Sequence, residues 1–468
     1  MNRPSTVLMS IALCAAALAA QTVDRSKPPA TPPIPNYKLP PVFESALPNG
    51  LNMVLVEDAR FPLVTARLNF AAGSKFDPPD LPGLAEAVAS LLTEGTAART
   101  SRQISEQVDS IGGALSAAAG PDALTIAGNA LSENLPALLD LMADVSLHAN
   151  FPAGEIDLYK RTRAEGLKAE RAQPAFLAEE RMSHAVYGST PYAHISPTPL
   201  SIRKLDAAPL ASYRDAHLVP ENATLIVLGR LPARADLMKI VTRDFGSWLR
   251  KAPPAPPKIV PPPPRRQIVL VDRPGSVQAD IHVGRLAPPR TAPEFFPLLV
   301  GNNILGGGAD SRLFRDVRER DGYAYDAHSE YDTDRDAAML VAVTEVRNEV
   351  IEPALKEVLA EMDGMASQRV SAPELEHVQD YLCGLYLLRL ETQEGVAAQL
   401  NSMRTLGLPR DYLETYTARV RSVGPAAVET AARRYIAPAQ SIIVVVGDAA
   451  KIAEALKKFG PVRVEADQ

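Results

Sequence analysis

The two halves of this chain resemble each other in sequence. The segment LNMVLVEDA at residues 51–59 is similar to RQIVLVDRP at residues 266–274, with an offset of 215 residues when the shared VLV is aligned. The segment PENATLIVLGRL at residues 220–231 is similar to PAQSIIVVVGDA at residues 438–449, with an offset of 218 residues. Two matches with nearly the same offset, at opposite ends of each half, indicate an internal duplication. The sequence therefore predicts two domains of similar fold.

Two proline-rich segments mark the expected boundaries. KAPPAPPKIVPPPPRR, at residues 251–266, lies near the middle of the chain and has the composition of a semi-rigid linker. QTVDRSKPPATPPIPNYKLPP, at residues 21–41, is expected to form an extended leader. We therefore expect an N-terminal domain over residues 42–250 and a C-terminal domain over residues 267–468.

The order of expected strands and helices is the same in both halves. Apolar, β-branched runs predict strands, and longer periodic segments predict helices. The expected strands lie at residues 64–70, 124–127, 225–228, 268–271, 338–344 and 442–446, and the expected long helices at 131–146 and 348–365. GLAEAVASLLTEGT, at residues 83–96, predicts a further helix that stops near Gly95. Strands mixed with helices in each half predict an α+β layer in each domain.

The N-terminus has the features of a secretory signal peptide. Arg3 precedes the apolar run at residues 7–20, in which Ala17 and Ala19 form the A-x-A arrangement that signal peptidase accepts. The run is shorter than the about 20 residues that a transmembrane helix needs, and no later apolar run is longer. We therefore expect residues 1–20 to be a signal peptide and the mature chain to be exported, with no integral membrane segment.

The two cysteines constrain processing and disulfide bonding. Cys14 lies within the apolar run and leaves lipidation open, although Leu13 precedes it where lipoprotein signals need a small residue. Once the signal peptide is removed, only Cys383 remains, so an intramolecular disulfide is excluded.

Composition bears on the class of partner. Of the 468 residues, 46% are hydrophobic and 22% are charged, which is ordinary for a soluble globular protein. The formal net charge of -6 and the pI of about 5.8 provide no basic surface for nucleic acid. We expect no nucleic-acid partner.

Several longer segments resemble a known enzyme family. LPNGLNMVLVED, AAGSKFDPPDLPGLAEAVASLLTEGT, YGSTPYAHISPTPLSIRKL, SRLFRDVRERDGYAY and ATLIVLG resemble, in the same order, segments of the pitrilysin, insulinase and mitochondrial processing peptidase family of inverted zinc peptidases. The resemblance covers nearly the whole mature chain. It implies two homologous α+β domains, joined by the proline-rich linker, that face each other across a chamber like the halves of a clamshell.

The zinc motif of that family is degenerate here. Active members carry H-x-x-E-H on a helix, in which two histidines bind zinc and the glutamate serves as general base. The resemblance places Glu86 and Ser90 at the histidine positions and Ala89 at the glutamate position. The resemblance also places a further family glutamate near Glu165, without fixing its position. Because a catalytic zinc needs three protein ligands, we expect no metal and no catalytic residue in this chain.

The histidines offer no replacement motif, because no two of them stand three or four residues apart on a helix. We expect them to be scattered packing and surface residues. They are His148, His184, His194, His217, His282, His328 and His377.

The second half keeps a different family feature. Arg318 and Tyr325 fit an arginine and tyrosine seven residues apart that, in the family, hold the bound peptide near its scissile carbonyl. A guanidinium and a phenol can both donate hydrogen bonds to a carbonyl oxygen or to the oxyanion that it becomes. Arg312 and Arg315 lie nearby and leave the choice of arginine open. The structural alternative is that Arg318 caps a helix and Tyr325 packs in a strand.

Some branches of the family divide the work between a chain with the zinc motif and a chain with the arginine and tyrosine. The resemblance thus implies a non-catalytic, substrate-binding subunit, inactive alone, of a periplasmic heterodimeric zinc metalloendopeptidase that degrades or processes peptides. The expected partners are a homologous H-x-x-E-H subunit, which would hold the zinc, and an extended peptide. The alternative is a structural or assembly protein with a peptidase-like fold. An independent hydrolase has no Ser/His/Asp or Cys/His spacing in its favour.

Overall fold

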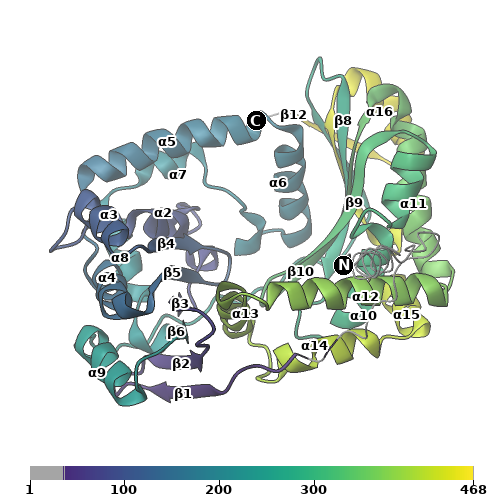
Figure 1. Cartoon of the computed structure of the whole chain (residues 1–468). Coiled ribbons are helices and arrows are strands. Elements are labelled where there is room, and N and C mark those ends of the chain that lie inside the picture. The colour runs from purple at the N-terminus through teal and green to yellow at the C-terminus, as the bar shows by residue number, and fades with distance from the viewer. Residues whose placement is uncertain (1–34, 36, 467–468) are drawn as a thin grey trace, which may run out of the picture. The chain divides into compact units, whose positions relative to one another are not determined.

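The computed structural model describes residues 35 and 37–466 and contains two six-stranded sheets, one in each half of the chain (Figure 1). The first sheet consists of β1 Val42–Ala46, β2 Asn52–Glu57, β3 Leu63–Phe70, β4 Ala114–Ala119, β5 Leu124–Leu131 and β6 Ala223–Gly229. The second consists of β7 Gln267–Asp272, β8 Gln278–Ala287, β9 Ala324–Thr333, β10 Ala338–Arg347, β11 Ile442–Gly447 and β12 Val462–Ala466. The predicted signal peptide at residues 1–20, Cys14 and most of the leader lie outside the described residues.

The topology of the two sheets confirms two α+β domains of similar fold. Their strand orders are β1-β2-β6-β3-β5-β4 and β12-β7-β11-β8-β10-β9, so five strands correspond one to one. In both sheets a single inner pair is parallel, β2 with β6 and β7 with β11. The outermost strands differ, because β1 precedes β2 and is antiparallel to it, whereas β12 comes from the C-terminal end and is parallel to β7.

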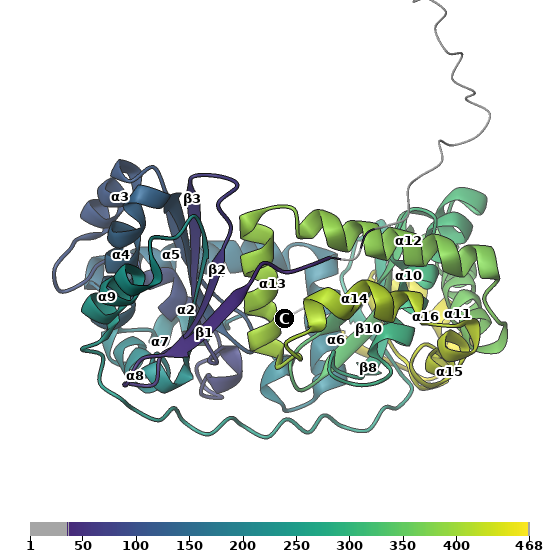
Figure 2. The same ribbon diagram turned by 60° about the horizontal axis from the view of Figure 1, so that its bottom comes forward.

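In both halves, helices lie between the strands and after them in the chain. In the first half they are α2 Leu84–Leu91, α3 Ser101–Ser110, α4 Leu135–His148, α5 Ala153–Arg171, α6 Pro174–Tyr187, α7 Pro199–Lys204, α8 Ala207–His217 and α9 Arg234–Phe245. In the second they are α10 Phe295–Gly306, α11 Ile351–Ser367, α12 Ala372–Arg389, α13 Gln393–Leu406, α14 Tyr412–Arg421, α15 Pro425–Tyr435 and α16 Ala449–Leu456, with a π-helical turn, η5 Phe314–Arg320. Residues 251–266 form no helix or strand and run as an extended segment between α9 and β7 (Figure 2).

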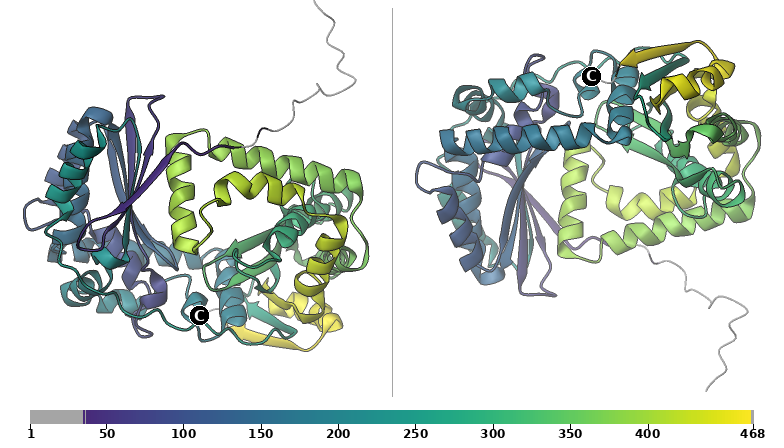
Figure 3. Two further views of the ribbon diagram at one scale, coloured as in Figure 1. Left: turned by 90° about the horizontal axis from the view of Figure 1, so that it is seen from below. Right: turned by 90° about the horizontal axis from the view of Figure 1, so that it is seen from above.

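Two helices pack on the sheet of the opposite half. Helix α6 contacts β8 and β11, and its side chains Leu177 and Met182 share a buried core with Val341 and Val444. Helix α13 contacts β3 and β6 (Figure 3). At its first residue, Gln393 Nε2 donates a hydrogen bond of 2.8 Å to the carbonyl oxygen of Asp58. Each sheet is therefore covered in part by a helix from the other half of the sequence.

Three expected helix boundaries were wrong. The helix expected from residue 348 begins at Ile351, because Asn348–Val350 form a separate 3-10 turn. Helix α2 ends at Leu91 instead of near Gly95, because Gly95 has a φ of +150° and pairs with Thr100 in an isolated bridge. The helix expected from residue 131 begins at Leu135, because β5 stays paired with β3 as far as Leu131. Among the described helices, none combines the length and apolar character needed to cross a membrane.

Candidate functional site

A cavity of about 460 Å³ lies beside α2, the helix predicted from the sequence to hold the degenerate zinc motif. Its lining comes from the start of α2, the turn between β4 and β5, helix α6, residues 189–196 and the end of β9. Five carboxylates are among the lining residues: Asp77, Glu86, Glu179, Asp332 and Asp334. The motif helix therefore faces an acidic cavity.

The N-terminus of α2 is fixed by one buried carboxylate. Gly83 precedes the helix with a φ of +89°, a conformation that glycine adopts without strain. The Asp77 carboxylate accepts hydrogen bonds from the backbone N–H groups of Gly83, Leu84 and Ala85 at 2.8, 3.1 and 2.9 Å. Burial raises the pKa of Asp77 to about 7, and the three N–H donors, which favour the charged form, offset this only in part.

An arginine lies against Glu86, the first of the predicted motif positions. Arg163, from α5, places its Nε 2.7 Å from Glu86 Oε1 and its Nη1 3.0 Å from Glu170 Oε2. The Tyr159 hydroxyl lies 3.5 Å from the same Glu86 oxygen. Glu86 is thus a partner of a guanidinium within a small network between α2 and α5.

The other motif positions do not supply ligands. Ala89 is buried in the core, and Ser90 is exposed. Glu165 is exposed and forms an ion pair of 2.6 Å with Lys168 on its own helix. This donor set, with a guanidinium beside Glu86, does not fit a zinc ion. Among residues 35 and 37–466, no group of three or more His, Cys, Asp or Glu side chains is arranged to hold a metal ion.

Two histidines meet in a way that their spacing did not predict. The rings of His184 and His194, ten residues apart in sequence, lie edge to face with centroids 5.2 Å apart. Burial, and then the neighbouring His194, lowers the pKa of His184, which favours its neutral form at neutral pH. The spacing of the two histidines in the sequence did not predict this contact, because α6 ends between them and they do not share a helix.

A buried aspartate joins both halves next to the cavity. Asp122 Oδ1 accepts hydrogen bonds from Lys75 Nζ at 2.7 Å and from the Tyr192 hydroxyl at 2.6 Å. Its Oδ2 accepts a bond of 2.7 Å from the backbone N–H of Arg335 in the second half. Sequence reasoning missed this cluster because its members come from four separate segments.

Arg318 and Tyr325 are brought together. The Arg318 Cζ lies 5.1 Å from the centroid of the Tyr325 ring and 4.3 Å from that of Phe314. Tyr325 is 86% exposed, so its hydroxyl faces outward. Arg318 lies in η5, and Tyr325 lies at the start of β9.

The two other candidate arginines, Arg312 and Arg315, pair with carboxylates. Arg312 forms two hydrogen bonds of 2.9 Å with the carboxylate of Glu374. Arg315 forms an ion pair of 3.1 Å with Asp316. Arg318 is therefore the member of this group that stacks on Tyr325.

The arginine–tyrosine pair and the motif helix do not meet within this chain. Tyr325 is near one end of β9, whereas Asp332, which lines the cavity with Glu86, is near the other. Seven residues of strand span about 23 Å at about 3.3 Å per residue. The two sets of sequence-predicted residues therefore lie in separate regions of the molecule.

Comparison with known proteins identifies the family. Residues 52–198 match the model described as insulinase, peptidase family M16, and residues 204–382 match the model of the peptidase M16 inactive domain. The chain belongs to peptidase family M16. The crystal structure of a peptidase M16 inactive domain from Pseudomonas fluorescens is similar to this M16 chain, with a TM-score of 0.81 and 26% identity, over 87% of this chain and 98% of that one.

Other relatives of this M16 chain are described as proteases. An uncharacterized zinc protease of Bacillus subtilis is 24% identical over 345 residues, which cover 74% of this chain and 83% of the relative. The crystal structure of a protease from Helicobacter pylori shares the fold, with a TM-score of 0.81 and 18% identity, over 87% of this chain and all of that one. The family is that of metallopeptidases, and the assignment of Glu86, Ala89 and Ser90 to its motif positions stays a prediction from the sequence.

Proposed function

We propose that this M16 chain is the non-catalytic, substrate-binding subunit of an exported, periplasmic heterodimeric zinc metalloendopeptidase. Its partner is a homologous subunit that carries H-x-x-E-H and holds the zinc. In this proposal Arg318 and Tyr325 bind the peptide at the partner's zinc site. The observation that carries it is the stacked, outward-facing pair that Arg318 forms with Tyr325.

The exposure of Tyr325 supports a role in binding. At 86%, it is the most exposed of the large apolar and aromatic side chains in the described residues. A tyrosine that only packed within a strand would bury its ring. Arg318 lies over the ring face, an arrangement that holds the guanidinium in place while leaving the phenol hydroxyl open to a ligand.

The state of the motif helix supports assigning the chemistry to the partner. The Glu86 carboxylate pairs with Arg163, and Ala89 provides no general base. Hydrolysis by the family mechanism requires a metal-bound water and a base near it. In the proposal, this chain contributes binding and orientation of the peptide, and the partner contributes the zinc and the base.

The test is peptide cleavage by the complex reconstituted with its H-x-x-E-H homologue. Arg318→Ala and Tyr325→Phe should each lower kcat by about 10²–10³, because losing one oxyanion donor typically costs about 2.7–4 kcal/mol. The Phe variant keeps the aromatic ring and removes only the hydroxyl. Subunit association, followed by light scattering, should remain unchanged.

Arg315→Ala is the matched control, since Arg315 lies in the same π-helical turn and is paired with Asp316. Its turnover should stay within about twofold of wild type, which is far below the cost of a lost oxyanion donor. If Arg318→Ala and Tyr325→Phe also stay within that range, the substrate-binding role is wrong and the structural or assembly role replaces it. Failure to associate with the homologue would reject the heterodimer itself.

A further inference from the structure

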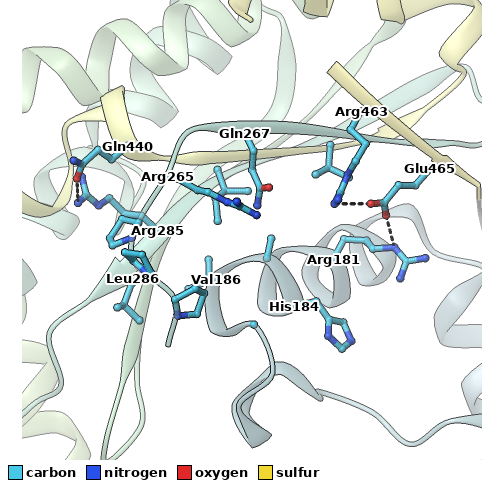
Figure 4. A pocket seen from close by; sticks show the side chains of 17 residues that line it. Arg181, His184, Val186, Arg265, Gln267, Arg285, Leu286, Gln440, Arg463 and Glu465 are labelled. Carbon is cyan, nitrogen blue, oxygen red and sulfur yellow. Dashed lines mark hydrogen bonds and ion pairs between the residues drawn. The ribbon is translucent and has the colours of Figure 1, made fainter. Parts of the chain in front are cut away.

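A second cavity, of about 360 Å³, is lined mainly by cationic and apolar side chains. It is bounded by α6, residues 262–265 of the proline-rich linker, β7, β8 and the C-terminal strands (Figure 4). Its lining includes four arginines, Arg181, Arg265, Arg285 and Arg463, and a single carboxylate, Glu465. The formal charge of these five side chains is therefore +3.

Arg285 is a buried cation with neutral partners. Its residue is only 6% exposed. Nη2 donates to Gln440 Oε1 at 3.1 Å and Nη1 donates to the carbonyl oxygen of Ala437 at 3.3 Å. Nε has no hydrogen-bond partner among the described residues. Burial lowers the pKa of this guanidinium, which reflects the cost of holding a charge away from water. An anion in the cavity would offset that cost.

The cavity already accommodates one oxyanion of the chain itself. Glu465 Oε1 lies 2.6 Å from Arg463 Nη2, and Glu465 Oε2 lies 3.5 Å from Arg181 Nε. Figure 4 shows Arg463, Glu465 and Arg181 on one side of the lining, with Arg285 and Gln440 on the other and Arg265 between them. The chain's own carboxylate thus pairs with two of the four arginines.

We propose that this cavity binds a small phosphate monoester, whose dianionic head contacts Arg265 and Arg285. A phosphate offers several acceptor oxygens, which match the donors of two guanidiniums better than one carboxylate does. The apolar side chains of Val186, Leu286 and Ile442 line the same cavity and provide contact for an organic body. The ligand class is therefore a phosphate monoester with a compact apolar group.

The test is isothermal titration of the purified full-length protein with phenyl phosphate, in a buffer free of phosphate. Inorganic phosphate and benzoate are titrated in parallel. Phenyl phosphate should bind saturably at one site, more tightly than inorganic phosphate, which lacks the apolar group, and than benzoate, which carries one charge. Arg285→Lys and Arg265→Gln should each weaken binding by about tenfold or more.

Two further variants should not weaken the binding of phenyl phosphate. Glu465→Gln should tighten binding, because it removes the competing carboxylate and frees Arg181 and Arg463. Arg102→Gln, which changes an exposed arginine paired with Glu106 on α3, should leave binding unchanged. Because Arg265 is exposed, Arg265→Gln keeps the test valid even if the Arg285 variant does not fold. The proposal is overturned if phenyl phosphate shows no saturable binding, if benzoate binds equally tightly, or if Arg265→Gln binds like wild type.

Discussion

At the scale of single residues, the pKa is raised by burial for four carboxylates that line the acidic cavity: Asp77, Glu179, Asp332 and Asp334. Burial is the main cause that raises the pKa of Asp334 to about 7, and the nearby charges of Asp122 and Asp332 act in the same direction. Lys75 opposes them only in part. The native fold therefore favours the protonated form of Asp334 at mildly acidic pH.

This predicts a pH dependence of folding stability. Because the folded pKa lies above the unfolded value of 3.8, the native state binds more protons than the unfolded state between these two values. The contribution of Asp334 is fully present below the unfolded pKa and is lost as the pH rises through 7. Asp334→Asn should therefore lose less stability than wild type between pH 5 and pH 7.5, measured by urea unfolding. An equal loss in both proteins would contradict the assignment.

The family resemblance places the zinc-motif positions at Glu86, Ala89 and Ser90, and this assignment stays a prediction. The sequence did not indicate which side chains surround these residues. Arg163, the partner of Glu86, lies 77 residues away on α5, and no local pattern connects the two. The stacking of Arg318 on Tyr325 is consistent with their seven-residue spacing, although the role of the pair stays a prediction.

At the scale of elements, α2 and α5 form the unit that would have to change to recover a metal site. Helix α2 contains the two predicted ligand positions, Glu86 and Ser90, and Arg163 of α5 places a positive charge against Glu86. A cation beside a divalent metal ion opposes its binding electrostatically. Restoring the motif on α2 alone therefore leaves an unfavourable neighbour and only two ligands.

We expect Glu86→His with Ala89→Glu and Ser90→His to bind zinc weakly. Adding Arg163→Glu should tighten zinc binding by about 10–100-fold or more, because it removes the opposing charge and adds a carboxylate on the facing helix. Competition with a chromophoric chelator measures the affinity. Arg161→Glu, an exposed change of the same charge on α5, is the control and should have little effect. Equal affinity with and without the Arg163 change would refute the argument.

The ends of a strand were predictable where an apolar, β-branched run starts and stops clearly in the sequence, as for β3 and β11. The assignment of helices to sheets was not. The apolar face of α6 shows that the helix must be covered, but its sequence does not say which sheet covers it. The packing of α6 on β8 and β11 depends on contacts with residues at least 90 positions later in the chain, which no local pattern encodes.

At the scale of the whole molecule, the exchange of α6 and α13 makes each half depend on the other. Leu177 and Met182 of α6 are 1% and 0% exposed. They belong to a core that also contains residues of β11, and α6 contacts both β8 and β11 of the second half. Replacing one such side chain by alanine typically costs about 2–5 kcal/mol, so losing the whole helix would leave that sheet unstable. The domain boundaries at residues 42–250 and 267–468 therefore stay predictions. They do not imply that either half folds without the other.

Cleavage within residues 251–266 provides the corresponding test. The linker contains no helix or strand, so a specific protease site placed there should be cut without loss of core contacts. The two fragments should elute together in gel filtration and separate only in denaturant. Uncut protein carrying the same insertion is the control. Fragments that elute separately under native conditions would show that the exchanged helices contribute little.

The outermost strands of the two sheets also bear on the history of the chain. Five strands of each sheet correspond in order and direction, whereas β1 and β12 occupy equivalent edges with opposite directions and come from opposite ends of the polypeptide. The edge strands therefore lie outside the part that the two halves share, and the repeat that the two sheets have in common is a unit of five strands.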